Sequence, residues 1–67
     1  MSILYGDNIR AERARKNMSQ LQLAEKSGLH YNTITRYEKN RVDIPIGNLM
    51  KIARALEVEL DDLLKIK

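Results

Sequence analysis

Two helical segments separated by a very short link constrain this chain more than any other feature. The first segment opens at Ser19, where the Ser-x-x-Gln spacing to Gln22 lets each side chain satisfy a free backbone amide of the other residue. It ends at Gly28, a residue that readily takes the positive φ of a helix end. Only three or four residues, beginning with Gly28, separate this segment from the next helical run, Tyr31 to Lys39. This spacing predicts a helix-turn-helix with its core at about residues 19–39.

The rest of the chain also has helical periodicity. Apolar residues recur every three or four positions, and no stretch alternates with period two for long enough to indicate a strand. We expect a first helix from about Ile3 to Lys16, capped by Ser2 or Asp7. Its inner face would carry Tyr5 and Ile9.

The second half of the chain predicts two further helices after a loop from Arg41 to Pro45. Pro45 and Gly47 indicate the start of a helix from about Ile46 to Leu56. Its expected buried residues are Leu49, Ile52, Ala53 and Leu56. A short last helix is expected from Leu60 to Ile66. The predicted fold class is therefore all-α, a compact five-helix bundle.

Length and composition favour one small domain covering residues 1–67. Sixty-seven residues are near the lower limit for a single core without covalent or metal support. The chain has no cysteine, which excludes disulfides and thiolate metal sites. No apolar run is long enough for a membrane span, and the start of the chain does not have the pattern of a secretory signal. We therefore expect a soluble intracellular protein without a membrane partner.

Charge is distributed unevenly along the chain, whose net charge is +3. Residues 1–41 contain eight Lys or Arg against four acids, giving +4. Residues 42–67 contain four Lys or Arg against five acids, giving −1. A basic half beside a slightly acidic half is typical of a face that binds a polyanion. Charge alone leaves open that the basic end arises by chance.

The helix expected at Tyr31–Lys39 separates its side chains into two arcs. At about 100° per residue, one arc carries Ile34, Tyr37, Glu38 and Thr33, and the other carries Tyr31, Asn32, Thr35, Arg36 and Lys39. Asn can pair with adenine, Arg with guanine, and Thr or Tyr with a thymine methyl in the major groove. The alternative is an ordinary surface helix with a solvated polar side. A surface serving solubility alone would more usually carry Glu and Lys, so we favour base reading.

Glu38 falls on the inner, apolar arc, where an unpaired carboxylate would be costly. Arg13, one turn beyond Ile9 on the first helix, is the best-placed cation. We therefore expect a buried Arg13–Glu38 salt bridge that locks this helix to the first. A hydrated Glu38 at the margin of the core remains the alternative.

Residues 9–64 resemble the Cro and phage-repressor type of DNA-binding domain, the lambda-repressor-like helix-turn-helix of the XRE family. The matching residues are Ile9, Arg13, the block SQLQLAEKSGLHYNTITRYEKN, Pro45 and the block LMKIARALEVELDDLL. The resemblance implies five helices, with the second lying across the DNA backbone and the third in the major groove.

The resemblance also implies contacts with double-stranded DNA. The expected base contacts are Tyr31, Asn32, Thr35 and Arg36. The expected backbone contacts are Ser19, Gln20, Thr33, Lys39, Asn40 and Arg41. Two departures stand out. His30 occupies a position where Ser or Thr usually caps the third helix, so that helix start is expected to be less firmly fixed. Asn40 replaces a frequent Gly, but Asn tolerates the left-handed conformation.

The function expected from these features is transcriptional regulation, as a repressor that binds an inverted-repeat operator as a homodimer. Leu64 and Ile66 are the expected dimer contacts. Two alternatives remain, an antitoxin of a toxin–antitoxin pair and a protein-interaction module that retains the fold without binding DNA. His30 is the only histidine, and no nucleophile–base arrangement, phosphate loop or Ca²⁺-loop spacing is present. We therefore expect no enzyme activity, cofactor, metal or small-molecule substrate, and a cytoplasmic location at prokaryotic or phage DNA.

Overall fold

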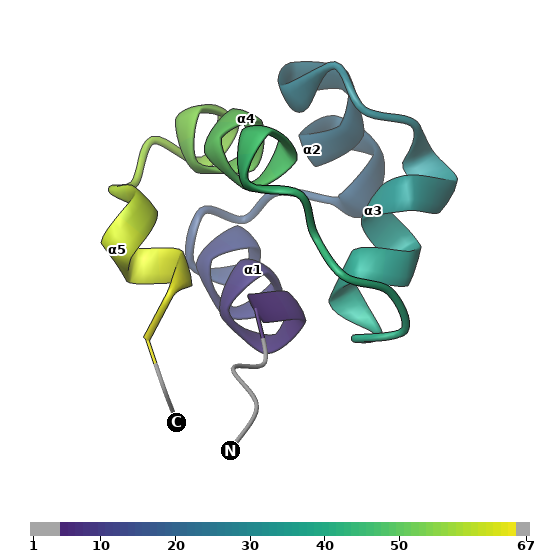
Figure 1. Ribbon diagram of the computed structural model, residues 1–67. Helices are drawn as coiled ribbons and strands as arrows, with labels where there is room; N and C mark the ends of the chain where they lie inside the picture. Colours follow the sequence, from purple (N-terminus) through teal and green to yellow (C-terminus); the bar gives the residue numbers. More distant parts are fainter. Residues whose placement is uncertain (1–4, 66–67) are drawn as a thin grey trace.

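Five helices form the part of the protein that the computed structural model describes, residues 5–65 (Figure 1). They are α1 (Tyr5–Arg15), α2 (Gln20–Ser27), α3 (Tyr31–Glu38), α4 (Ile46–Leu56) and α5 (Leu60–Leu63). Residues 5–65 contain no strand. Helix α1 packs against α3, α4 and α5, and α2 packs against α3 and α4. The predicted all-α, five-helix class is confirmed.

A single hydrophobic core lies between the helices, and each helix contributes to it. The buried apolar residues are Ile9, Leu23, Ala24, Ile34, Tyr37, Leu49, Ile52, Ala53, Ala55, Leu56 and Leu63. The four residues predicted for the inner face of α4 are all among them. Tyr5 is half-buried and packs against the same core. The helical periodicity in the sequence therefore marks the core correctly.

The helix ends differ from the predicted ones by a few residues. Helix α1 ends at Arg15 rather than Lys16, because Asn17 takes a positive φ of 53° and the N–H of Met18 bonds the carbonyl of Arg13 at 3.1 Å. Asp7 lies inside the first turn of α1, so it is not the cap. The predicted start at Ile3 and the cap alternative Ser2 lie outside the described residues.

Helix α3 ends at Glu38, one residue before the predicted Lys39. Helix α5 ends at Leu63, short of the predicted Ile66, which lies outside the described residues. The N–H of Leu64 bonds the carbonyl of Asp61 at 3.1 Å, closing the last turn tightly. At the start of α5, Asp62 accepts from the backbone N–H of Glu59 at 3.0 Å. Two hydrogen bonds lower the pKa of the Asp62 carboxyl. The larger effect comes from the Lys65 ammonium and the smaller one from the backbone N–H of Glu59.

Both ends of α2 have the predicted geometry. Ser19 Oγ accepts from the N–H of Gln22 at 3.0 Å, and Gln22 Oε1 accepts from the N–H of Ser19 at 2.8 Å. Gly28 has a φ of 75°, and its N–H bonds the carbonyl of Ala24 at 3.0 Å. These local bonds fix both ends of α2 and so fix where α3 begins.

No helix within residues 5–65 has the length and apolar character needed to cross a membrane.

Candidate nucleic-acid interface

Helix α3 presents one polar arc to solvent and buries the other. Tyr31, Asn32 and Arg36 are exposed, as is Lys39 just beyond the helix end. On the opposite side, Ile34, Tyr37 and Glu38 are buried, and Thr33 is half-buried. The side chains suited to hydrogen bonding with base edges therefore share a free surface, while the core holds the helix from behind.

His30 is the N-cap of α3, and its side chain makes the capping hydrogen bond. Its backbone is extended, with a φ of −68° and a ψ of 146°, and its Nδ1 accepts from the N–H of Asn32 at 3.1 Å. The imidazole nitrogen therefore supplies the capping bond that a Ser or Thr oxygen supplies elsewhere.

Thr35 is half-buried, and its hydroxyl is turned toward its own helix. Its Oγ1 donates to the carbonyl of Asn32 at 2.8 Å. The hydroxyl proton is therefore occupied, and the methyl group is what Thr35 can offer to a thymine methyl.

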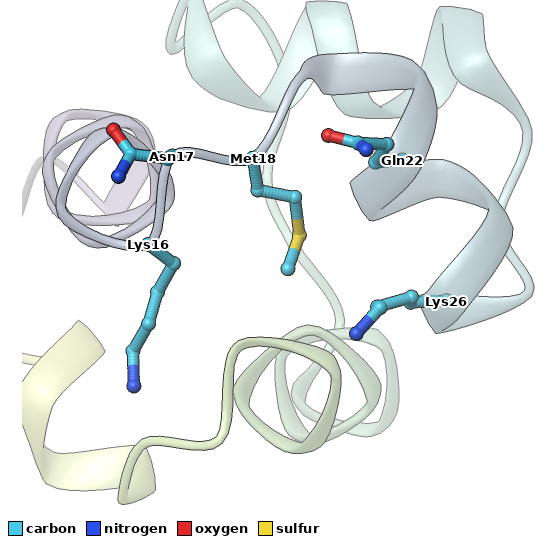
Figure 2. A pocket seen from close by; sticks show the side chains of 5 residues that line it. All are labelled: Lys16, Asn17, Met18, Gln22 and Lys26. Carbon is cyan, nitrogen blue, oxygen red and sulfur yellow. The ribbon is translucent and has the colours of Figure 1, made fainter.

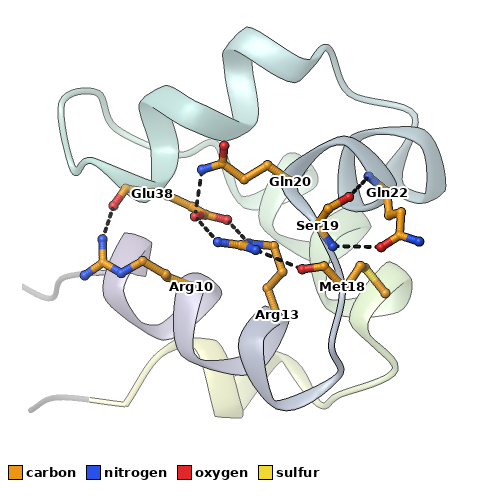
Figure 3. A network of polar contacts seen from close by, with 7 residues as sticks. All are labelled: Arg10, Arg13, Met18, Ser19, Gln20, Gln22 and Glu38. Carbon is orange, nitrogen blue, oxygen red and sulfur yellow. Dashed lines mark hydrogen bonds and ion pairs between the residues drawn. The ribbon is translucent and has the colours of Figure 1, made fainter.

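Glu38 is the centre of a polar network at the inner side of α3 (Figure 3). Arg13 Nε donates to Glu38 Oε2 at 2.7 Å, and Arg13 Nη2 donates to Oε1 at 3.0 Å. Arg13 Nη1 also donates to the carbonyl of Met18 at 2.8 Å. The Glu38 side chain is 2% exposed and that of Arg13 18%. The expected Arg13–Glu38 pair is thus present as a two-pronged, buried ion pair that joins α1 to α3.

Gln20 joins this network from the first turn of α2. Its Nε2 donates to Glu38 Oε1 at 3.0 Å, and its side chain is half-buried. Sequence reasoning placed Gln20 at the DNA backbone but did not foresee this internal bond. Ser19 next to it is exposed, with its hydroxyl engaged in the cap of α2.

The C-terminal end of α3 is hydrogen-bonded to Arg10 in the middle of α1. Arg10 Nη1 donates to the carbonyl of Glu38 at 3.0 Å, and Arg10 Nη2 donates to Asp7 Oδ1 at 2.9 Å. A cation at this end also interacts favourably with the helix dipole. Sequence reasoning missed Arg10, although its spacing of three residues from Asp7 was a usable signal.

Asn40 takes the expected left-handed conformation, with a φ of 58°. Its Oδ1 accepts from the N–H of Gly6 at 2.9 Å, and its Nδ2 donates to Asp7 Oδ1 at 3.1 Å. The side chain expected at the DNA backbone is therefore bonded within the protein. Lys39 and Arg41, on either side of Asn40, are exposed.

A further link, not foreseen from the sequence, connects α3 to α4. Asn48 Nδ2 donates to the hydroxyl oxygen of buried Tyr37 at 2.9 Å. Helix α3 is thus bonded on its inner side to α1, α2 and α4.

A shallow, open pocket lies at the link between α1 and α2 (Figure 2). It is lined by Lys16, Asn17, Met18, Gln22 and Lys26. None of these residues belongs to α3, so the pocket is separate from the polar arc. Across residues 5–65, no group of three His, Asp or Glu side chains is placed to hold a metal ion.

The structure describes one of the two expected dimer residues. Leu64 is half-buried and packs against the core, and Ile66 lies outside the described residues. Two large apolar side chains are exposed one turn apart on α4, Ile46 and Met50.

Comparison with known proteins gives a family match along most of the chain. The family model described as helix-turn-helix matches residues 9–63. Control protein C.SmaI of Serratia marcescens is 36% identical over 61 residues, which cover 91% of this chain and 73% of that protein.

Solved structures give the same result. The restriction-modification controller protein C.AhdI of Aeromonas hydrophila superimposes with a TM-score of 0.87 at 31% identity, covering 91% of this chain and 92% of that one. SinR of Bacillus subtilis, a master regulator for biofilm formation solved in complex with DNA, superimposes with a TM-score of 0.85 at 32% identity. The match covers 91% of this chain and 98% of that one.

Proposed function

Because this chain belongs to the XRE-type helix-turn-helix family of DNA-binding transcriptional regulators, we propose that it is a repressor that binds an inverted-repeat operator as a homodimer. Helix α3 enters the major groove and reads base edges with Tyr31, Asn32, Thr35 and Arg36. A single domain, residues 1–67, performs this function.

The observation that carries the proposal is the division of α3 into a buried arc and an exposed polar arc. Its inner side is anchored by Ile34, Tyr37 and Glu38, so its orientation is set by the core. The exposed side then offers Asn32 and Arg36, whose amide and guanidinium groups can make two-pronged contacts with adenine and guanine. A rigid support behind base-reading side chains is what sequence discrimination requires.

Contacts with the phosphate backbone flank this arc on both sides. Ser19 and Gln20 at the start of α2 contact one strand, together with Thr33. Lys39 and Arg41 are exposed cations after α3, and they contact phosphates there. Asn40 contributes through its turn, which holds Lys39 and Arg41 in place, since its side chain is bonded to Gly6 and Asp7.

The homodimer follows from the size of the binding surface. One reading helix spans a few base pairs, which is too little for discrimination among the many competing sites of a genome. Two-fold pairing doubles the reading surface and requires two inverted half-sites about one helical turn apart. We place the dimer contact at the C-terminal half, with Leu64 and Ile66 as its residues, because that half is slightly acidic and DNA repels it.

Selection of bound sequences from a random duplex pool tests the proposal. We expect the recovered sequences to share an inverted repeat, and the protein to retard them in a gel as a complex with two protein chains. Recovery of no shared sequence, with no retardation of any duplex, would favour an interaction module that retains the fold. Copurification of a toxin from the native host would favour the antitoxin role.

A narrower role as a controller of restriction-modification genes is favoured by two of the relatives. C.AhdI is a restriction-modification controller protein and C.SmaI is a control protein, and this chain covers most of the length of both. We expect the selected operator to occur upstream of genes for a DNA methyltransferase and an endonuclease. Operators located only at unrelated genes would contradict this narrower role.

A further inference from the structure

We propose that Glu38 is a positioning residue for DNA binding: its carboxylate orients the Gln20 amide toward a phosphate and fixes the start of α2 relative to α3. This inference rests on the proposed function, because it assigns a cause to one of its backbone contacts. It gives Glu38 a role beyond holding α1 and α3 together.

The geometry at the Glu38 carboxylate carries this inference (Figure 3). Oε1 accepts two hydrogen bonds at 3.0 Å, one from Arg13 Nη2 and one from Gln20 Nε2. Oε2 accepts from Arg13 Nε at 2.7 Å. One buried oxygen therefore serves residues of α1 and α2 at once, and the carboxylate itself belongs to α3.

The bond also decides which way the Gln20 amide faces. An ionised carboxylate only accepts hydrogen bonds, so the NH₂ group of Gln20, and not its oxygen, must point toward Glu38. One N–H is used in this bond, and the other is left to donate to an external acceptor such as a phosphate oxygen. No hydrogen bond among residues 5–65 uses that second N–H.

A Gln20 amide that is already ordered in the free protein favours DNA binding. A free Gln side chain loses considerable rotamer freedom when it is ordered, and that loss weakens any contact it makes. In this protein the Glu38 bond has already ordered Gln20 before DNA arrives. Arg13 balances the charge of Glu38, so the carboxylate holds the amide without presenting an unpaired negative charge to the phosphate.

A comparison of Gln20→Ala in two backgrounds tests the coupling. The second background is Arg13→Met with Glu38→Leu, which replaces the buried ion pair by apolar side chains and is often tolerated. The probe is a duplex recovered by the wild-type protein from a random pool. We expect Gln20→Ala to weaken binding about tenfold in the wild type, and less than about twofold in the apolar background. An equal factor in both backgrounds would overturn the proposal, because a purely structural role of Glu38 leaves the Gln20 contact intact.

Side-chain NMR of the free wild-type protein decides the same question without DNA and without a variant. Asn32 is the reference for an untethered amide, because its side chain is exposed and its NH₂ group makes no hydrogen bond within residues 5–65. We expect ¹⁵N relaxation to show a rigid NH₂ group in Gln20 and a more mobile one in Asn32. Equal mobility of the two NH₂ groups would contradict the proposed ordering of Gln20 by Glu38, even if DNA binding is confirmed. Absence of any duplex binding by the wild type would instead overturn the proposed function.

Discussion

The backbone of Gly6 lies directly against the carbonyl oxygen of Tyr37, so α1 and α3 meet there with no side chain between them. A Cβ added to Gly6 would collide with that oxygen and would also crowd Asn40 Oδ1. Both obstacles belong to a tight turn that is held by hydrogen bonds, including the bond from the Gly6 N–H itself. Glycine is therefore required at this position by close approach and not by its backbone angles.

Gly6→Ala should lower the free energy of unfolding by about 1–3 kcal/mol, because the collision must separate the two helices. Gly47 is a matched control within a helix, since an added Cβ there has no atom within 4 Å. Gly47→Ala should raise the free energy of unfolding by up to about 1 kcal/mol through helix propensity. Thermal and urea unfolding measure both, and equal shifts in the two variants would contradict the close contact.

Arg13→Ala and Glu38→Ala should each lower the free energy of unfolding by roughly 3–5 kcal/mol, because each change leaves the other charge buried and unpaired. The double replacement should cost much less than the two single changes together. Lys65→Ala, which removes the exposed Lys65–Asp62 pair, should have a much smaller effect. Strict additivity in the thermal-melt cycle would show that the two charges do not act as a pair.

Binding to duplex DNA should weaken steeply with salt, because each phosphate contact releases counterions. For the dimer we expect a slope of roughly −5 or steeper when log K is plotted against log[salt]. Lys39→Ala should reduce this slope if Lys39 contacts a phosphate on each half-site. An affinity that does not change with salt would contradict all of the proposed contacts with DNA phosphates.

The spacing of the half-sites should matter as well. Insertion of about five base pairs, roughly half a helical turn, rotates one half-site to the opposite side of the duplex. Affinity for the altered duplex should fall toward that of a single half-site, as measured by gel retardation. Unchanged affinity and stoichiometry would show that two domains bind independently, and the homodimer would then be wrong.

Local patterns in the sequence predicted more of the fold than of the candidate site. The cap of α2, the turn at Gly28 and the inner residues of α4 each depend on neighbours within a few positions, and all are present in the structure. The Arg13–Glu38 pair could be predicted because a charge on an apolar arc requires a partner.

Contacts that depend on how the helices are placed in space could not be predicted from local sequence patterns. The Gln20–Glu38 bond, the Asn48–Tyr37 bond and the bond between Asn40 and Gly6 join residues on different elements. Their side chains carry no periodic signal, so nothing in the spacing singles them out. The cap bond of His30 was not predicted either, since histidine is uncommon as a cap although its Nδ1 is a suitable acceptor.

Base reading by α3 is tested most directly by comparing Arg36→Ala with Lys39→Ala on a panel of selected operators, each with one base pair changed. Both residues are exposed cations near the end of α3, so the two variants remove the same charge. Arg36→Ala should lose discrimination at one position in each half-site, worth about 1–3 kcal/mol, and keep the preferences at the other positions. Lys39→Ala should weaken binding to all sequences alike. A uniform loss for Arg36→Ala as well would make Arg36 a backbone contact and contradict its assignment as a base-reading residue of α3.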